Sequence, residues 1–457
     1  MPPIEAKKLQ CVNDRLKGRI LAPGEGNWDE ARGAFNVLLD QRPAAIALPA
    51  DAHDVTMAVR LAAEHGLRVA PQSTGHGAGA LGDLEDTILL KTSAMTHVSV
   101  DGDAKCARTG AGARWQDLAP HTSGLGLAAL QGFSPGVGIV GYSLGGGLGW
   151  YSRKFGLASS SVTAVELVAP DGRHLRASAE SEPDLFWALR GGAGNFGVVT
   201  EIEFRLYDVG EIYAGGLFFP FERAAEVLSA WNEWQATAPD EVTSVGRLLQ
   251  FPPLEVVPEP MRGKSFAIVQ AAYLGSEADG AELIAPLRDL GPAMDTFTAV
   301  APDALGTMHM DPAQPAPAVS GDLLLGELPA SAIDDLLAVA GPGSGSILTS
   351  VELRQTRGAL ARPEPSCGAL AAVPGALALY AVASPPNEDA AETMRGQIAA
   401  VISALSPHEA GRLLNFADQP LDTAGAFSPE SFSRLQKVKA QYDPDGVMHA
   451  NHPVPAA

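Results

Sequence analysis

Hydrophobic and polar positions in the first half of the chain form short segments of both α and β type. Residues 52–65 carry apolar side chains at helical spacing, which predicts a helix that ends at Gly66. Short strands that are joined by turns favour an α+β fold over a doubly wound parallel sheet. The strands are predicted at 45–48, 67–70, 87–90, 98–100, 105–109, 164–169 and 198–206.

The pattern changes after about residue 210, where longer apolar strands and an amphipathic helix follow one another. The helix is predicted at 221–235, and we expect its Trp231 and Trp234 to be core residues. The order of elements predicts an antiparallel sheet with helices on one face. Strands are predicted at 214–219, 242–251, 266–273, 347–355 and 376–383.

A glycine-rich loop follows the predicted strand at 67–70, and it places His76 between Gly75 and Gly77. Glycine allows positive φ and a close approach of the backbone, so successive N–H groups can converge on an anion such as a pyrophosphate. A mobile surface turn with a solvated histidine is the alternative interpretation of this loop alone.

Two further glycine-rich loops lie at 131–157 and 190–197. Gly136, Gly138 and Gly141 match the dinucleotide-binding pattern G-x-G-x-x-G, but Ser134-Pro135 precedes them instead of a strand. The glycine run at 145–147 also makes a normal crossover helix improbable, because each interior glycine costs about 1 kcal/mol relative to alanine. Three such loops in one domain indicate a cofactor much larger than a phosphate group.

The formal charge of −21 argues against binding of a nucleic-acid backbone and gives no sign of a membrane-surface protein. The first residues lack an apolar signal segment, and no apolar run reaches membrane-spanning length. We therefore expect a cytoplasmic protein with two or three domains. Three scattered cysteines, Cys11, Cys106 and Cys367, fit neither a disulfide framework nor a zinc site, and we expect no metal.

Five segments together resemble a known family. They are Arg-Pro-Ala at 42–44, Ser-Thr-Gly-His at 73–76, the glycine-rich stretch 134–157, the stretch 184–204 and the C-terminal stretch 442–453. This set resembles the FAD-linked oxidases related to berberine bridge enzyme. The resemblance implies a two-part FAD-binding domain of the PCMH type, formed by 1–209 and 408–457. A substrate-binding domain at 210–407, an antiparallel sheet covered by helices, would be inserted between the two parts.

The resemblance also implies how the cofactor is held. His76 occupies the place of the histidine that carries the flavin covalently in relatives. Ser134 stands where many relatives have a cysteine that forms a second bond, and a hydroxyl does not replace a thiolate. We therefore predict a single attachment through His76. Val137 matches a valine beside the flavin that mildly favours reaction with O2. The other predicted FAD-binding residues are Gln72, Ser73, Thr74, Gly75, Gly77, Ser134, Gly138, Gly141, Gly146, Gly147, Asn195, Phe196, Gly197, Val198 and Asn451.

Candidate catalytic residues lie on the predicted strand 347–355, where period-2 geometry puts Glu352 and Arg354 on one face. The corresponding strand faces the flavin in relatives, and Arg354 stands where some of them have a base. A guanidinium cannot accept a proton, so Glu352 is the predicted base and Arg354 an anion anchor or oxyanion partner. An ordinary surface Glu/Arg pair is the alternative.

Two segments that carry tyrosines in relatives lack them here, at 145–149 and 413–416. Both common phenolic bases are therefore missing, which weakens a carbohydrate-oxidase interpretation. After Glu352, the remaining titratable candidates for the catalytic base are, in this order, Tyr380, Tyr273 and His309.

The predicted function is an FAD-dependent oxidoreductase, an oxidase that transfers hydride from an alcohol, an amine or an activated C–H to the flavin. O2 would be the acceptor, and secondary metabolism is a possible setting by family analogy. The alternatives are a flavin dehydrogenase with another acceptor and a flavin-containing protein that binds or sequesters a ligand without catalysis. Neither the substrate nor the oligomeric state can be derived from the sequence.

Overall fold

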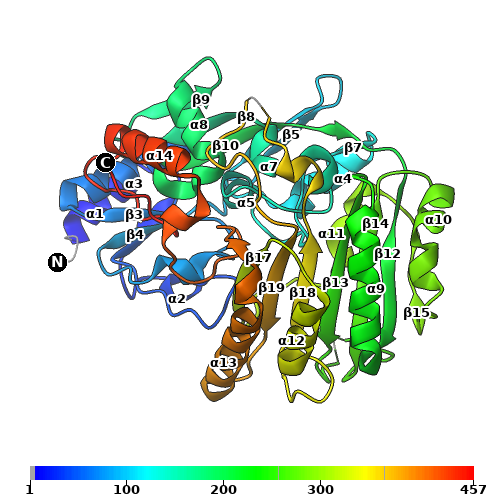
Figure 1. Ribbon diagram of the computed structural model, residues 1–457. Helices are drawn as coiled ribbons and strands as arrows, with labels where there is room; N and C mark the ends of the chain where they lie inside the picture. The colour runs from blue at the N-terminus through cyan, green and yellow to red at the C-terminus, as the bar shows by residue number, and fades with distance from the viewer. Residues whose placement is uncertain (1–5, 256, 365) are drawn as a thin grey trace.

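The computed structural model describes residues 6–255, 257–364 and 366–457 and arranges them around three main β-sheets (Figure 1). Two smaller sheets form the part that carries both chain ends, and a large sheet with helices on its outer face forms the rest. The α+β class and the antiparallel inserted sheet are confirmed.

The first sheet has the strand order β1-β2-β4-β3, with β2, β4 and β3 parallel to one another. Helix α3 (Ala52–His65) packs on one face through Val55, Val59 and Ala62 and ends at Gly66, whose φ is 64°. The strands of this sheet are β1 (Arg19–Leu21), β2 (Ala45–Leu48), β3 (Arg68–Gln72) and β4 (Thr87–Lys91).

The second sheet is antiparallel, with the order β5-β6-β10-β8-β9. Residues Val168 and Val198 extend the core of the first sheet into this one, so the two sheets form one packed unit. Its elements are β5 (Val98–Asp101), β6 (Cys106–Gly110), α4 (Trp115–Ser123), β8 (Val162–Val168), β9 (His174–Ser178), α8 (Pro183–Gly192) and β10 (Val198–Arg205).

The glycine-rich stretch between α4 and β8 contains only short helices. Helix α5 (Ile139–Leu144) begins after Gly138 and ends at Gly145, after six residues. A Cβ atom at Gly149 would lie 1.9 Å from the carbonyl oxygen of Gln131, so the chain can pack there only as glycine. As predicted, the G-x-G-x-x-G match does not open a normal crossover helix. Helices α6 (Ser152–Phe155) and α7 (Ala158–Ser161) follow.

The third sheet is built on the path β15-β12-β14-β13-β18-β19-β17-β20, which begins with the short strand β15 (Met294–Asp295). Helices α9, α12 and α13 cover its outer face (Figure 1), and Trp231 of α9 is fully buried there, as predicted. The strand β17 was not recognised from the sequence. The main elements are β12 (Ile212–Pro220), α9 (Ala224–Thr237), β13 (Val242–Gln250), β14 (Ser265–Tyr273), α10 (Glu277–Arg288), β17 (Val319–Leu325), α12 (Ala330–Ala340), β18 (Ser350–Gln355), β19 (Leu377–Ala383), α13 (Glu388–Leu405) and β20 (Glu409–Gly411).

The chain then returns to the first sheet through α14 (Pro429–Tyr442). The amide of Val69 on β3 donates to the carbonyl of Val447 over 2.7 Å, and the amide of His449 donates to Val69 over 2.9 Å. The C-terminal segment thus lies beside β3 like an added strand. Since β20 still belongs to the third sheet, the predicted domain boundary at 407 falls two residues before that strand begins.

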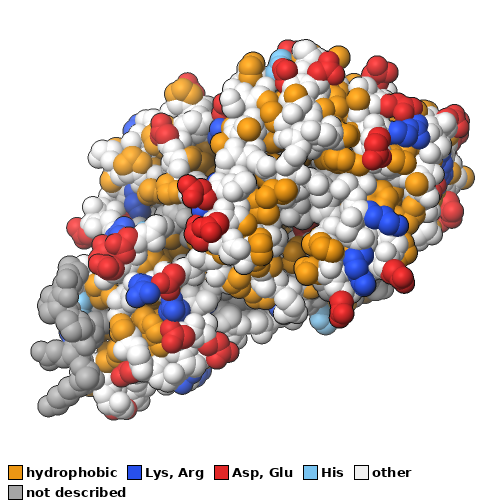
Figure 2. All heavy atoms as spheres, turned by 90° about the horizontal axis from the view of Figure 1, so that it is seen from below, with side chains coloured by type: hydrophobic (Ala, Val, Ile, Leu, Met, Phe, Trp, Pro, Cys, Tyr) orange, Lys and Arg blue, Asp and Glu red, His pale blue; other side chains and the backbone are white. Residues whose placement is uncertain are grey.

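Figure 2 shows the molecule from below, with hydrophobic side chains around a hollow near the middle of the face and charged side chains on either side. Within the described residues, no helix is both long and apolar enough to cross a membrane. The described part of the chain also contains no cluster of three or more metal-ligating side chains.

Candidate functional site

The loop after β3 holds His76 in a fixed orientation. Its ring stacks on Phe35 with centroids 3.8 Å apart, and its Nδ1 lies 2.7 Å from the hydroxyl of Thr74. Burial lowers the pKa of His76 to about 4, so the imidazole is neutral at ordinary pH. A neutral, oriented imidazole is a nucleophile. The alternative of a mobile, solvated histidine is therefore excluded.

The first and second glycine loops meet at Ser73. A Cβ atom at Gly138 would lie 2.8 Å from Ser73 Oγ, and the buried Ser73 hydroxyl has no hydrogen-bond partner among the described residues. Gly75 has a φ of 80°, and a Cβ atom there would lie 2.9 Å from Ala34. The side-chain amide of Asn451 donates to the carbonyl of Gly77. The C-terminal segment therefore reaches the same loop.

The third loop is joined to the C-terminal segment by Asn195. Its amide donates to Gly192 O at 2.8 Å and to His452 O at 3.0 Å, and its oxygen accepts from Val454 N at 2.8 Å. The side chains of Phe196 and Val198 are fully buried in the two cores. These two predicted cofactor residues therefore present almost no surface to a ligand.

Asn415 fixes the glycine run at 145–147. Its oxygen accepts from the amide of Gly147 over 2.8 Å, and its side-chain amide donates to Tyr142 O over 3.1 Å. A Cβ atom at Gly147 would lie 2.6 Å from the ring of Tyr142. The hydroxyl of Tyr142 is buried and has no hydrogen-bond partner among the described residues. Gly141, by contrast, has open space around its Cα.

Lys91, at the end of β4, is a buried cation beneath the His76 loop. Its Nζ donates to Gly33 O at 2.7 Å and to Gln72 Oε1 at 2.5 Å, and Gln72 in turn binds Gln41. No acidic partner of Lys91 is found in the part of the chain that the structure describes. Burial lowers the pKa of Lys91 to about 8. Gln72 therefore contributes to the His76 loop through its hydrogen bonds with Lys91 and Gln41.

The inner face of the third sheet carries a buried cluster around Glu352. Its Oε2 accepts from Arg354 Nη2 at 2.7 Å and lies 2.9 Å from His309 Nε2, and its Oε1 lies 3.2 Å from Arg247 Nε. Ser350 donates to Oε1 at 2.9 Å. Glu352 and Arg354 share one face, as predicted, whereas Val351 and Leu353 of the same strand pack under the helices.

The burial and the charged neighbours of Glu352 correct two interpretations made from the sequence, the surface ion pair and the general base. Glu352 is 1% exposed and Arg354 is 5% exposed, so they are not a surface ion pair. Burial acts to raise the pKa of Glu352, but His309, Arg354 and Arg247 outweigh it and hold the pKa well below its usual range. A carboxylate with so low a pKa is a poor proton acceptor at neutral pH, so Glu352 does not suit the predicted role of general base.

Aromatic rings surround the guanidinium of Arg354. Its Cζ lies 4.3 Å from the ring centroid of Phe133, 4.9 Å from that of Phe416 and 5.3 Å from that of Tyr380. Burial raises the pKa of the Tyr380 phenol above its usual value. Tyr380 and Glu352 lie opposite each other on β19 and β18.

Of the two lower-ranked candidates for the catalytic base, His309 lies in this site and Tyr273 does not. His309 is fully buried within the cluster, and burial lowers its pKa. Tyr273 packs instead against the core under the helices, on the other face of the sheet, and is not part of this site.

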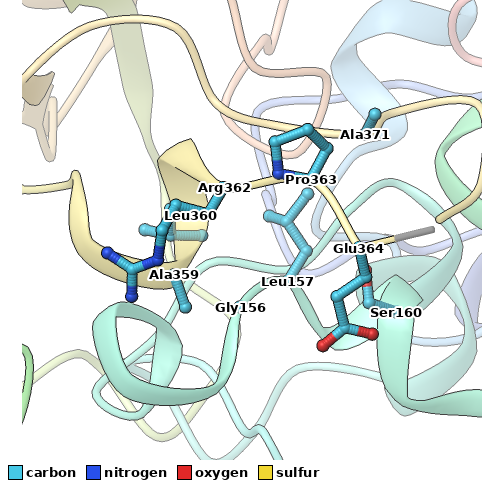
Figure 3. A pocket seen from close by; sticks show the side chains of 9 residues that line it. All are labelled: Gly156, Leu157, Ser160, Ala359, Leu360, Arg362, Pro363, Glu364 and Ala371. Atoms are coloured by element: carbon cyan, nitrogen blue, oxygen red, sulfur yellow. The ribbon is translucent and has the colours of Figure 1, made fainter. Parts of the chain in front are cut away.

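A separate hollow of about 300 Å³ lies between α6, α7 and the segment 359–371 (Figure 3). Leu157 and Leu360 line it, together with Arg362 and Glu364. Arg362 pairs with Asp240 at 2.6 Å. None of the predicted cofactor or catalytic residues lines this hollow, so it is distinct from the site described above.

Two family models match the chain. A model described as "FAD binding domain" matches residues 43–178, and one described as "Berberine and berberine like" matches residues 414–455. The chain is therefore similar to berberine bridge enzyme-like FAD-linked oxidases in both its N-terminal and its C-terminal part. The first match covers the His76 loop and the glycine run, and the second covers Asn415 and Asn451. The predicted resemblance is confirmed.

Individual relatives agree with this assignment. (R)-6-hydroxynicotine oxidase of Paenarthrobacter nicotinovorans is 28% identical over 96% of each chain. Chitooligosaccharide oxidase of Gibberella zeae is 32% identical over 64% of this chain and 58% of its own length. A solved glucooligosaccharide oxidase from Acremonium strictum has a TM-score of 0.81 at 23% identity, over 98% of this chain and 99% of its own, and carries cysteinyl- and histidyl-linked FAD. The prediction of an FAD-dependent oxidoreductase is confirmed.

The residues present fit FAD. Around the loop that is predicted to hold a diphosphate lie two buried donors, at Ser73 and Gln41, that have no partner among the described residues, and the buried cation Lys91. Phe35, Lys91 and Arg247 were not recognised from the sequence. For the last two a signal existed, because each is a cationic residue within an otherwise apolar or small-residue strand.

The charge of Lys91 should be visible in the pH dependence of stability. The folded chain lowers its pKa from 10.5 to about 8, so the unfolded chain binds this proton more tightly. Stability should therefore rise between about pH 8 and 10.5, by an amount on the order of 1–3 kcal/mol. In His76→Ala protein from which the non-covalently bound FAD has been removed, Lys91→Met should abolish this rise in urea titrations. The exposed Lys437→Met is the matched control, and an identical slope in both variants would contradict the assignment.

Proposed function

We propose that this protein is an oxidase that holds FAD covalently through His76 alone and oxidises a small-molecule alcohol or amine with O2. The observation that carries the proposal is the neutral imidazole of His76, stacked on Phe35 and bound to Thr74. Ser134 is a weaker nucleophile than the cysteine of the doubly linked relative. Bound FAD would supply a two-electron acceptor for a hydride from the substrate.

The chain's own residues would hold the cofactor along three loops. The backbone of 73–77, the hydroxyl of Ser73 and the positive charge of Lys91 suit a diphosphate. Gly138 comes close to the same loop, because a Cβ atom there would lie 2.8 Å from Ser73 Oγ. Gly146 and Asn195 belong to the two other glycine-rich loops. Val137, partly exposed beside Gly138, supports the choice of O2 as acceptor by family resemblance.

The substrate would bind on the inner face of the third sheet. With Glu352 held ionised, the proton acceptor must be another group on that face. Asp322 of β17 lies opposite Tyr380 of β19, and burial raises the pKa of Asp322 to about 6. A base with a pKa near the working pH is the effective one. We therefore propose Asp322, acting directly or through Tyr380, as the group that takes the substrate's O–H or N–H proton.

The test is a two-stage measurement on purified protein. Flavin absorbance should bleach when a panel of alcohols and amines is added without O2, and it should return when O2 is admitted, with about one peroxide formed per flavin reoxidised. Bleaching that is reversed only by an added dye, with no peroxide, would identify a dehydrogenase. Binding of panel members without any bleaching would favour the non-catalytic alternative.

A further inference from the structure

The cluster around Glu352 has more positive than negative charge. Two guanidinium groups, those of Arg247 and Arg354, share the one carboxylate of Glu352. The nearby carboxyl groups pair elsewhere, since Asp322 lies 4.0 Å from Arg412 and Asp418 accepts from Ser320. A buried cation without a counter-charge is costly, and a bound anion would remove that cost.

The unpaired charge can be assigned to one edge of one side chain. Glu352 Oε2 accepts from Arg354 Nε at 2.9 Å and from Nη2 at 2.7 Å, which occupies one edge of the planar guanidinium. Nη1 of Arg354 has no acceptor among the described residues, so the edge formed by Nη1 and the second N–H of Nη2 is free. Two parallel N–H groups on such an edge match a carboxylate. Arg247 has no such edge, because it also binds Ser350 and His309.

The surroundings of that edge are aromatic. Phe133, Phe416 and Tyr380 all lie within 5.3 Å of the guanidinium carbon. The positive charge of Arg354 also acts on Tyr142, whose buried hydroxyl has no partner among the described residues. A flat, apolar ligand with an anionic end would satisfy both the unpaired donors and the rings.

The position of these rings links the edge to the cofactor loops. Phe133 directly precedes Ser134, and Phe416 directly follows Asn415, which binds Gly147. The free edge of Arg354 therefore lies among the segments that would hold the flavin, on the inner face of the sheet. A ligand bound there would be next to the reacting groups.

We propose that the free Nη1–Nη2 edge of Arg354 binds the carboxylate of an aromatic or conjugated substrate, with Phe133, Phe416 and Tyr380 against its flat part and Tyr142 as a further donor. Arg354 is thus the residue that selects acidic aromatic substrates. Glu352 positions it by holding the opposite edge. That the ligand is a substrate rests on the proposed function, but binding of an anion at this edge does not depend on turnover.

The test uses benzoate as the probe and benzamide as its neutral, planar counterpart. Binding to the flavin-loaded protein is measured near pH 8, where benzoate is ionised, by the change in flavin absorbance and by the rise in melting temperature. Benzoate should bind on the order of 10- to 100-fold more tightly than benzamide, as expected for a charge-assisted pair of hydrogen bonds. Acetate, which lacks the ring, should bind more weakly than benzoate.

Arg354→Gln should abolish this preference, and Arg354→Lys, which keeps the charge without the fork, should restore only part of it. Arg354→Gln should remain folded, because Glu352 keeps Arg247 and His309 as partners. Arg362→Gln, which alters an exposed pair with Asp240, is the matched control and should bind benzoate as the wild type does. Equal binding of benzoate and benzamide, or an unchanged preference in Arg354→Gln, would overturn the inference. If the protein carries no flavin, the proposed function fails while the melting measurement still tests this site.

Discussion

His76→Ala should leave no flavin in the acid-precipitated protein, whereas the wild type should stay yellow after the same treatment. We expect His76 to form the covalent bond because its side chain is both neutral at ordinary pH and fixed in place beside the glycine loops. Ser134, at the position of a second attachment in relatives, offers only a hydroxyl, whose nucleophilicity is far below that of a thiolate. The measurement is the flavin absorbance of the washed, denatured pellet.

Ser134→Ala is the control, and it should retain flavin at the wild-type level. Loss of acid-stable flavin in Ser134→Ala, or its retention in His76→Ala, would contradict a single attachment through His76. FAD bound without a covalent bond should still appear in His76→Ala before precipitation, because the backbone contacts of the loops are unchanged. That comparison separates loss of the covalent bond from loss of the binding site.

Glu352→Ala should lower the melting temperature by roughly 3–5 °C, because a buried ion pair that loses one partner costs about 3–5 kcal/mol and each kcal/mol shifts a chain of this size by about 1 °C. The replacement leaves Arg247 and Arg354 facing each other in the interior, each less than a tenth exposed and without a carboxylate. The measurement is thermal unfolding followed by circular dichroism.

Glu388→Ala is the matched control, because this glutamate also pairs with an arginine, Arg395, but its side chain is 72% exposed. An exposed pair contributes about 1 kcal/mol or less, so its melting temperature should shift by no more than about 1 °C. A Glu352→Ala protein that melts like the wild type but reduces its flavin far more slowly would show instead that Glu352 acts as a base.

Local patterns predicted most of the elements, because each depends on neighbours in the chain. The helix 52–65 with its terminal Gly66 and the strand at 87–90 needed only apolar spacing and one glycine. Strand β17 was missed because Pro-rich segments and a central Ser-Gly-Asp obscure its alternation, and only its partners β19 and β20 complete it.

The candidate site was harder to predict, because its chemistry depends on residues distant in the sequence. The sequence could place Glu352 and Arg354 on one face, but it could not show that Arg247 and His309 lie beside Glu352 and lower its pKa. It likewise gave no sign that Phe35 stacks on His76. A residue's burial and its charged neighbours are properties of the tertiary structure, so its role as base or as structural carboxylate follows only from the fold.

The hydrogen bonds of Val69 and Asn195 to the C-terminal segment set an order of events during synthesis. Both residues belong to the first half of the chain, but their partners Val447, His449, His452 and Val454 leave the ribosome after more than four hundred others. The two small sheets can form early, while the loop around His76 stays without Asn451. We therefore expect the nascent chain to retain a cofactor only after residues 447–454 have been synthesised and have docked against β3 and Asn195.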